Sequence, residues 1–314
     1  MTTPFTIVKP IVVNDSNFIS SSLPEDDYDE WDSVTTYGLG DRVIVIDNEE
    51  SPPVGVHKIY ESLENDNLDQ FPPDSPTKWI EVGATNRWAV FDSSGGTKST
   101  GTSPMDWTVA TGRIDSVALL EVQGATTVQI IAYSPSESSP GIVYDETFNL
   151  SDSNANTIID WYMYFFTAIR PRTEVLATNL PLYEDMEVTV IIDGDSTVSV
   201  GTLIFGVSRA IGITSLGAKS GIIDYSRKEV DQFGRAVLVK RRFSKRMDVT
   251  LLVENSEVDS VQYFLSDIRA EAVLWIGAKD TYELLTIYGF YRDFSIDISY
   301  PNQSLCTLEI EGLT

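Results

Sequence analysis

Apolar residues along most of the chain alternate with polar ones or gather in short runs between turn residues, which predicts β-strands. Clusters of Gly, Ser, Pro and Asp at 94–96, 138–141 and 193–195 predict turns between the strands. A series of short strands divided by such turns is typical of a β-sandwich, and we expect one of jelly-roll type over residues 86–207. Its predicted strands are 114–122, 127–133, 142–150, 161–166, 188–192 and 198–207.

One segment near the C-terminus has the period of a helix instead. Its apolar stripe consists of Val258, Val261, Phe264, Leu265 and Ile268. Ser256, with Asp259 three residues later, predicts a capping box at the start of this helix. Strands are predicted around it at 249–253, 273–276, 284–291, 294–300 and 304–310. Because the helix must pack its stripe against that sheet, we expect an α+β domain over residues 208–314.

The first 23 residues carry two short apolar runs beside Pro4 and Pro10, which predicts two extended segments and an N-terminal arm over residues 1–23. Such an arm either pairs with a neighbouring chain or belongs to its own domain, and the sequence leaves both open. The acidic run that follows, residues 24–32, lacks the Gly and the alternating ligand spacing of a calcium loop. We interpret it as a solvated linker.

Residues 24–85 predict a small β module whose strands are marked by aromatic residues. Its aromatics stand in the order Trp31, Tyr37, Tyr60 and Trp79, with a Gly40-Asp41 turn before the first strand. This order resembles the small chitin- and cellulose-binding modules appended to glycosidases and phage tail proteins. The resemblance implies that the four aromatics stack on the apolar faces of sugar rings. The alternative is that Trp31 and Tyr60 form the core, since a small module needs aromatics there, and that Trp79 or Tyr37 is exposed.

Charge divides the chain unevenly. The net charge is −25, of which residues 1–85 carry −13, residues 86–206 carry −10 and residues 207–314 carry −2. Phosphate repulsion opposes non-specific nucleic-acid binding by the first two parts. Residues 219–246, however, hold 9 basic and 3 acidic residues. We expect this strip to meet the acidic surface of an identical neighbour or another partner; contact with DNA in the DNA path of a virus particle is the alternative. The predicted interface residues are Arg235, Lys240, Arg241, Arg242, Lys245 and Arg246.

Residues that carry catalytic or metal chemistry are scarce. Cys306 is the single cysteine and His57 the single histidine, which excludes an internal disulfide, a Cys-based zinc site and a His-rich metal site. A Ser-His-Asp enzyme would need His57 as its base, and His57 lies far from any Ser in a sharp-turn motif, so we expect it at the surface or an edge. We expect no cofactor, no metal site, no catalytic residues and no enzymatic activity. No apolar run is long enough to span a membrane, and nothing at the N-terminus suggests secretion.

The most aromatic hexamer is 161–166. Alternate side chains of a strand point to opposite faces, so these rings cannot all enter one core. We expect the rings on the second face to pack within the sandwich or against a partner chain, rather than to line a ligand groove.

Three further segments, 86–92, 288–296 and 306–313, resemble stretches of tailed-phage structural proteins. A β-rich barrel with one helix is similar to the fold of phage tail-tube and tail-hub proteins. The resemblance implies a virion component, of tail-hub, baseplate or fibre-attachment type, made in the host cytoplasm. It would assemble as a homo-oligomer with other tail proteins, and its small module would touch host surface glycans. The alternative is a glycoside hydrolase or depolymerase with an appended binding module, although no pair of carboxylates is marked as catalytic.

Overall fold

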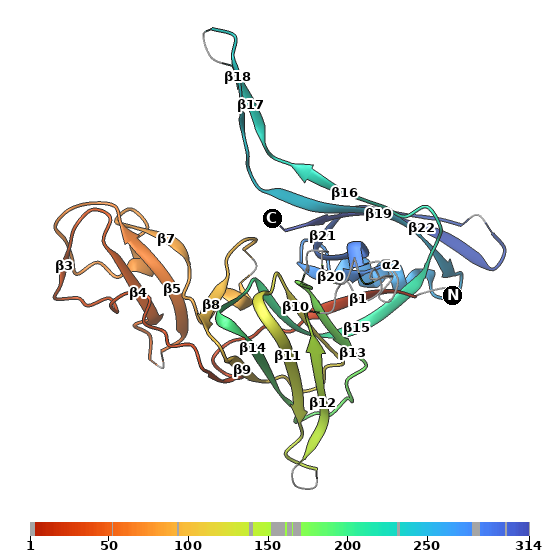
Figure 1. The fold of residues 1–314 in the computed structure, drawn as a ribbon, viewed down its shortest axis with the longest axis horizontal. Coiled ribbons are helices and arrows are strands. Elements are labelled where there is room, and N and C mark those ends of the chain that lie inside the picture. The colour runs from red at the N-terminus through yellow and green to blue at the C-terminus, as the bar shows by residue number, and fades with distance from the viewer. Residues whose placement is uncertain are drawn as a thin grey trace. The chain divides into compact units, whose positions relative to one another are not determined.

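The computed structural model describes residues 4–51, 53–92, 94–137, 141–151, 161, 165, 171–230, 233–277, 283–298 and 300–313. The chain forms two compact units. Unit 1 comprises Met1–Pro10, Ser93–Gly96 and Gly206–Thr314, and unit 2 comprises Ile11–Asp92 and Thr97–Phe205. Both are mainly β, which confirms the predicted class (Figure 1). The predicted boundary at 207/208 lies close to the end of unit 2, whereas the predicted module and sandwich fall together in that unit.

Unit 1 is built around an antiparallel barrel. Its strands are β1 (Pro4–Pro10), β15 (Thr202–Thr214, of which unit 1 holds the part from Gly206 onwards), β19 (Phe243–Glu254), β20 (Val273–Ile276), β21 (Thr286–Asp297) and β22 (Gln303–Gly312). They are hydrogen-bonded in the order β15-β1-β20-β21-β22-β19, and β19 pairs back with β15 through Leu252 and Ile213. Gly212 lies at this seam, where a Cβ would come within 2.6 Å of the Leu252 carbonyl oxygen. The close approach of the two backbones therefore requires glycine.

One α-helix, α2 (Val258–Asp267), packs against the barrel. Its predicted stripe is confirmed: Val261, Leu265 and Ile268 are buried in one cluster with residues of the strands. The predicted capping box is wrong. The chain already has helical dihedrals at Glu257, which is the N-cap residue and makes no side-chain cap hydrogen bond, so Ser256 lies outside the helix.

The N-terminal segment belongs to its own fold. In unit 1, β1 pairs with β15 on one side and β20 on the other, and Phe5 and Ile7 are fully buried. β2 (Phe18–Ser21) instead pairs with β9 (Met105–Ala110) in unit 2. The predicted arm 1–23 is therefore divided between the two units, and its strands pair within the chain.

Unit 2 has a β-sandwich-like layout. One sheet has the order β12-β11-β14-β9-β2, with β8 (Ser99–Thr102) also paired to β14. Here β11 is Gln123–Tyr133, β12 is Ile142–Asn149 and β14 is Glu187–Val200. β10 (Ser116–Leu120) pairs with β13 (Val175–Thr178), and their side chains share one core with those of β9, β11 and β14, including Trp107, Ile130 and Val190. The short helix η2 (Ala89–Phe91) precedes this sandwich.

Two predictions within the sandwich are wrong. Residues 193–195 form no turn, because they lie inside β14. Gly194 is needed there for close packing, since a Cβ would lie 2.1 Å from the Gly124 carbonyl oxygen on β11. Trp161 and Phe165 have helical rather than extended backbone, and their rings stack with centroids 6.3 Å apart. The other residues of the aromatic hexamer, and the predicted turn residues 138–140, lie outside the described residues.

The small module, also in unit 2, has a three-stranded sheet of order β4-β5-β7, formed by Arg42–Asp47, Gly55–Ser62 and Trp79–Ala84. A two-stranded ladder joins β3 (Thr36–Tyr37) to β6 (Asn67–Leu68), and η1 (Pro72–Asp74) lies between β6 and β7.

The remaining elements of unit 1 are β16 (Lys219–Asp224), β17 (Arg227–Val230), β18 (Ala236–Val239) and η3 (Glu283–Leu285). Among the described residues, no helix is long and apolar enough to cross a membrane.

Candidate assembly surface and the His57 cluster

The four aromatics predicted to bind sugar are mostly core residues. Trp79 is 2% exposed and Tyr37 is 9% exposed, so the predicted exposure of one of them is wrong. Their rings pack edge to face at 5.2 Å, and the Trp79 indole N–H donates to the Gln70 carbonyl at 2.9 Å. Tyr60 is buried in the same cluster, and Trp31 packs against it while half-buried. The module is small enough to need these rings as its core, so Tyr37, Tyr60 and Trp79 present no free face to a sugar.

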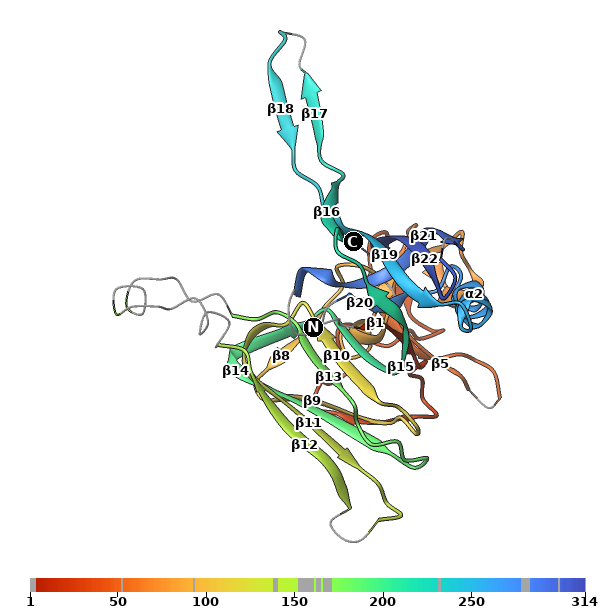
Figure 2. The same ribbon diagram turned by 90° about the vertical axis from the view of Figure 1, so that its right-hand side faces the viewer.

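The basic strip coincides with a hairpin that projects from unit 1. β16 and β19 pair as far as Asp224 and Phe243, and beyond this point β17 and β18 continue as a separate two-stranded ladder. We call residues 225–242 the arm. Figures 1 and 2 show it extending away from β16 and β19 in both views. Among the described residues, β17 and β18 pair with no third strand.

The arm exposes apolar side chains on both of its faces. The ladder pairs Lys228 with Leu238 and Val230 with Ala236, which places these four side chains on one face. Leu238 is 79% exposed and Val230 60%. Val237 on the other face and Phe233 near the tip are also exposed. A two-stranded hairpin is marginally stable alone in water, and exposed apolar patches mark interaction sites. The arm is therefore a candidate docking element.

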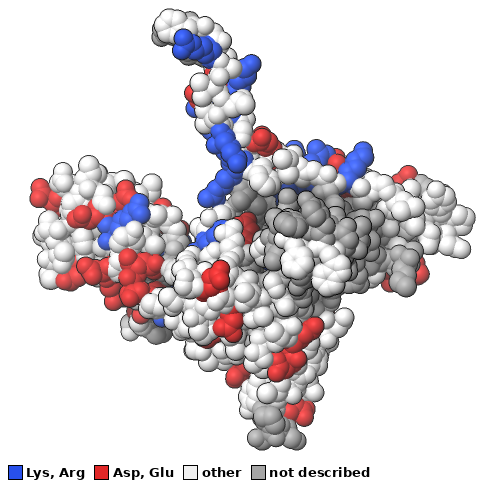
Figure 3. All heavy atoms as spheres, viewed as in Figure 1, with Lys and Arg blue, Asp and Glu red and all other residues white. Residues whose placement is uncertain are grey.

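The six predicted interface residues divide into two groups. Arg242 donates to the Gly95 carbonyl at 2.6 Å, and Arg246 forms an ion pair with Asp248, with an Nε to Oδ1 distance of 2.9 Å. These two cations therefore serve the structure of unit 1 itself. The other four residues of the predicted set are exposed, and so is Arg242, whereas Arg246 is half-buried; these four are Arg235, Lys240, Arg241 and Lys245. Figure 3 shows Lys and Arg side chains distributed along the arm.

Sequence reasoning missed Lys228 as a candidate interface residue. It lies on β17 beside Leu238, and no acidic side chain in the described part of the chain forms an ion pair with it. Arg227, its neighbour on the opposite face, instead pairs with Glu229. The alternation of a strand could have separated these two cations, had the strand at 227–230 been predicted.

The base of the arm is fixed to the barrel. The Tyr225 hydroxyl donates to Glu311 Oε1 on β22 at 2.9 Å, and this hydrogen bond raises the pKa of Tyr225. The Arg241 backbone N–H donates to Ser226 Oγ at 2.9 Å across the hairpin. The arm thus has an anchored base and an uncovered outer part.

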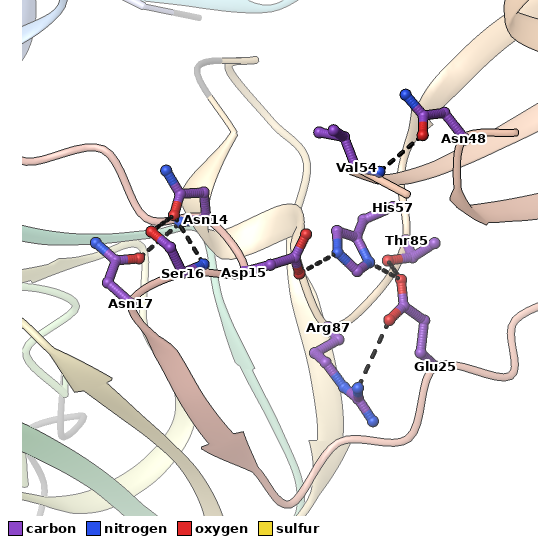
Figure 4. Close-up of polar contacts among 10 residues, drawn as sticks. All are labelled: Asn14, Asp15, Ser16, Asn17, Glu25, Asn48, Val54, His57, Thr85 and Arg87. Atoms are coloured by element: carbon purple, nitrogen blue, oxygen red, sulfur yellow. Dashed lines mark hydrogen bonds and ion pairs between the residues drawn. The ribbon is translucent and has the colours of Figure 1, made fainter. Parts of the chain in front are cut away.

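A second cluster surrounds His57 on β5 (Figure 4). The Nδ1 atom of His57 lies 2.9 Å from Glu25 Oε1, and its Nε2 atom lies 2.7 Å from Asp15 Oδ1. The His57 side chain is 14% exposed and that of Glu25 is 5% exposed, so the expected surface position of this histidine is wrong. The Trp88 ring and the carboxylates of Glu25 and Asp15 contact the imidazole and account for its burial.

Residues that follow β7 complete the cluster. Thr85 Oγ1 donates to Glu25 Oε1 at 2.7 Å, and Arg87 Nη1 lies 3.6 Å from Glu25 Oε2. The imidazole ring stacks on the Trp88 indole, with centroids 4.2 Å apart. Burial alone would lower the pKa of His57, but its hydrogen bonds to Glu25 and Asp15 outweigh burial and raise it. Burial likewise opposes ionisation of Glu25, yet the contacts with His57, Thr85 and Arg87 lower its pKa.

Within the described ranges, no group of three or more His, Cys, Asp or Glu side chains is arranged to hold a metal ion. No protein-family model and no curated protein matches this sequence.

Proposed function

We propose that the chain is a structural subunit of a phage-tail type assembly, as a tail-hub, baseplate or fibre-attachment component, and that identical copies join through the arm. The arm carries this proposal. It is a hairpin with exposed apolar side chains on both faces, and no other strand of the described residues covers it. Burying those side chains against another subunit would stabilise both the arm and the assembly.

Charge favours an identical copy as the partner. The segment that contains the arm, residues 219–246, holds 9 basic and 3 acidic residues, whereas residues 1–206 carry a net charge of −23. The basic segment of one copy therefore attracts the acidic region of another copy. The exposed cations Lys228 and Arg241 flank apolar side chains on the arm, so attraction and burial would act at the same surface.

The barrel of unit 1 supports the phage-tail part of the proposal. A barrel of antiparallel strands with one helix packed on it is the architecture that the resemblance of residues 288–296 and 306–313 implies. We include no glycan site in the proposal, because the rings of Tyr37, Tyr60 and Trp79 fill the core of the module.

Removing the arm tests the proposal directly. A variant in which Asn-Gly replaces residues 227–240 leaves the β16–β19 ladder and the Arg242 contact with Gly95 in place. Multi-angle light scattering should give an oligomer for the full chain and a folded monomer for the variant. An oligomer of unchanged size in the arm-less variant would contradict the proposal.

A further inference from the structure

The two nitrogens of His57 both face carboxylate oxygens, at 2.9 Å to Glu25 and 2.7 Å to Asp15. An ionised carboxylate only accepts hydrogen bonds, and a neutral imidazole has a single N–H to donate. Both contacts are therefore hydrogen bonds only when the ring is an imidazolium. We propose that His57 is a proton-operated clamp: as the imidazolium it binds Asp15 and Glu25 together, and loss of its proton releases Asp15 while Glu25 stays bound.

The order of release follows from burial. Glu25 is 5% exposed, whereas Asp15 is 51% exposed. Loss of a hydrogen-bond donor is costly for a buried carboxylate, because water cannot replace the donor. An exposed carboxylate is hydrated instead. The neutral ring therefore keeps its one proton on Nδ1, facing Glu25, and turns the unprotonated Nε2 towards Asp15. Two acceptors then face each other, and Asp15 separates.

The clamp joins three segments of unit 2. Asp15 lies in a turn that is braced internally, because the Asn14 N–H donates to Asn17 Oδ1 at 2.8 Å and the Phe18 N–H to the Asn14 carbonyl at 2.9 Å. This turn leads into β2 of the sandwich sheet, whereas His57 belongs to β5 of the module. Figure 4 shows the turn and Glu25 approaching the ring from opposite sides. Proton loss therefore detaches the turn before β2 from the module.

The charges around the ring favour the protonated state. Among the described residues, Asp15, Glu25 and Arg87 are the charged side chains that contact His57 or its carboxylates, so this cluster is neutral overall when His57 is cationic. The indole face of Trp88 also attracts a cation. Further away, Lys58 pairs with Glu81 at 2.9 Å, and Asp27 accepts the Asn86 N–H at 3.0 Å.

The pH range follows from the signs of the shifts. The pKa of His57 is raised above 6.5, so the clamp is fully closed below that pH and opens as the pH rises through the raised value. The pKa of Glu25 is lowered from 4.5, so its contribution is present above that pH and is lost as the pH falls through the lowered value. The clamp is therefore strongest in mildly acidic solution and opens towards alkaline pH.

Nuclear magnetic resonance can follow the clamp because His57 is the single histidine. Its imidazole signals should titrate with a midpoint above 6.5, and Asp15→Asn should lower that midpoint. Glu81→Gln is the matched control, since it removes a carboxylate that pairs with the neighbouring Lys58 and does not face the ring. The control should leave the midpoint unchanged.

Amide exchange on the full chain tests the order of release. After correction for the intrinsic pH dependence, protection of the Phe18 amide in the turn should fall roughly three- to tenfold as His57 loses its proton. The Thr85 amide, which donates to the His57 carbonyl at 2.9 Å, should keep its protection. Equal loss at both amides, unchanged protection at Phe18, or an Asp15→Asn midpoint equal to that of the wild type would overturn the proposal.

Discussion

Replacing Leu238 by aspartate should break the assembly without unfolding the chain. Leu238 is 79% exposed on the arm, so it contributes little to the fold of its own subunit. Its cross-strand neighbour is Lys228, and the same face carries Val230 and Ala236. If a second copy covers this face, Leu238 lies within the apolar centre of the contact.

The expected loss can be estimated from the exposed fraction. Full burial of a leucine side chain is worth about 1.5 to 3 kcal/mol. About four-fifths of that is available at Leu238, since 79% of the residue is exposed in the single chain. The aspartate adds the cost of a carboxylate placed in an apolar contact. A loss of about 2 to 3 kcal/mol of binding free energy for each arm corresponds to a roughly 30- to 150-fold larger dissociation constant.

Sedimentation velocity over a dilution series measures this change. Tyr263→Asp is the matched control, because Tyr263 lies on α2 outside the arm and is 78% exposed, and the substitution adds the same charge. Circular dichroism should show both variants folded. Association of Leu238→Asp as tight as that of the control, or equal dissociation of both variants, would refute an apolar contact through the arm.

Two further variants test the assignments of individual residues. Trp79→Ala should lower the free energy of unfolding by about 3 to 5 kcal/mol in chemical denaturation, because the ring is fully buried. Val34→Ala, at an 81% exposed position of the same module, should change it by less than about 0.5 kcal/mol. A Trp79→Ala variant of unchanged stability would show that the ring is not part of the core. Arg242→Ala should lower the thermal unfolding midpoint of unit 1, because it removes the hydrogen bond to the Gly95 carbonyl, worth about 0.5 to 1.5 kcal/mol. Arg241→Ala should leave that midpoint unchanged. Equal midpoints for the two variants would contradict the structural role assigned to Arg242.

Local patterns of the sequence predicted the local structure well. The strand at 273–276 coincides with β20, and the stripe of α2 enters the core as expected, because both depend on the spacing of neighbouring apolar residues. The predicted strands 284–291 and 294–300 are largely merged in one strand, β21, which continues past Arg292 with a shift of register.

Predictions failed where the local structure depends on residues far away in the chain. Gly194 resembles a turn glycine, yet it is needed because β11 approaches it closely from about 70 residues earlier. β1 completes the barrel by pairing with β15 and β20, and no local signal indicates these partners. The sequence also could not distinguish aromatics that fill the module core from aromatics that are exposed.

The candidate sites likewise depend on residues that lie far apart in the chain. Composition alone located the basic strip, but only the structure shows that Arg242 and Arg246 contact groups of their own unit. The His57 cluster has no sequence signature at all, since the bonded carboxylates lie 32 and 42 residues away along the chain.

The central claim is that copies of this chain associate through the arm. Light scattering of the purified full chain at low and at high salt tests it most directly. We predict an oligomer of defined mass at low salt, whose mean mass falls towards that of one chain as salt screens the cations of the arm. A mass equal to one chain at both salt concentrations, over the whole accessible range of protein concentration, would contradict the claim.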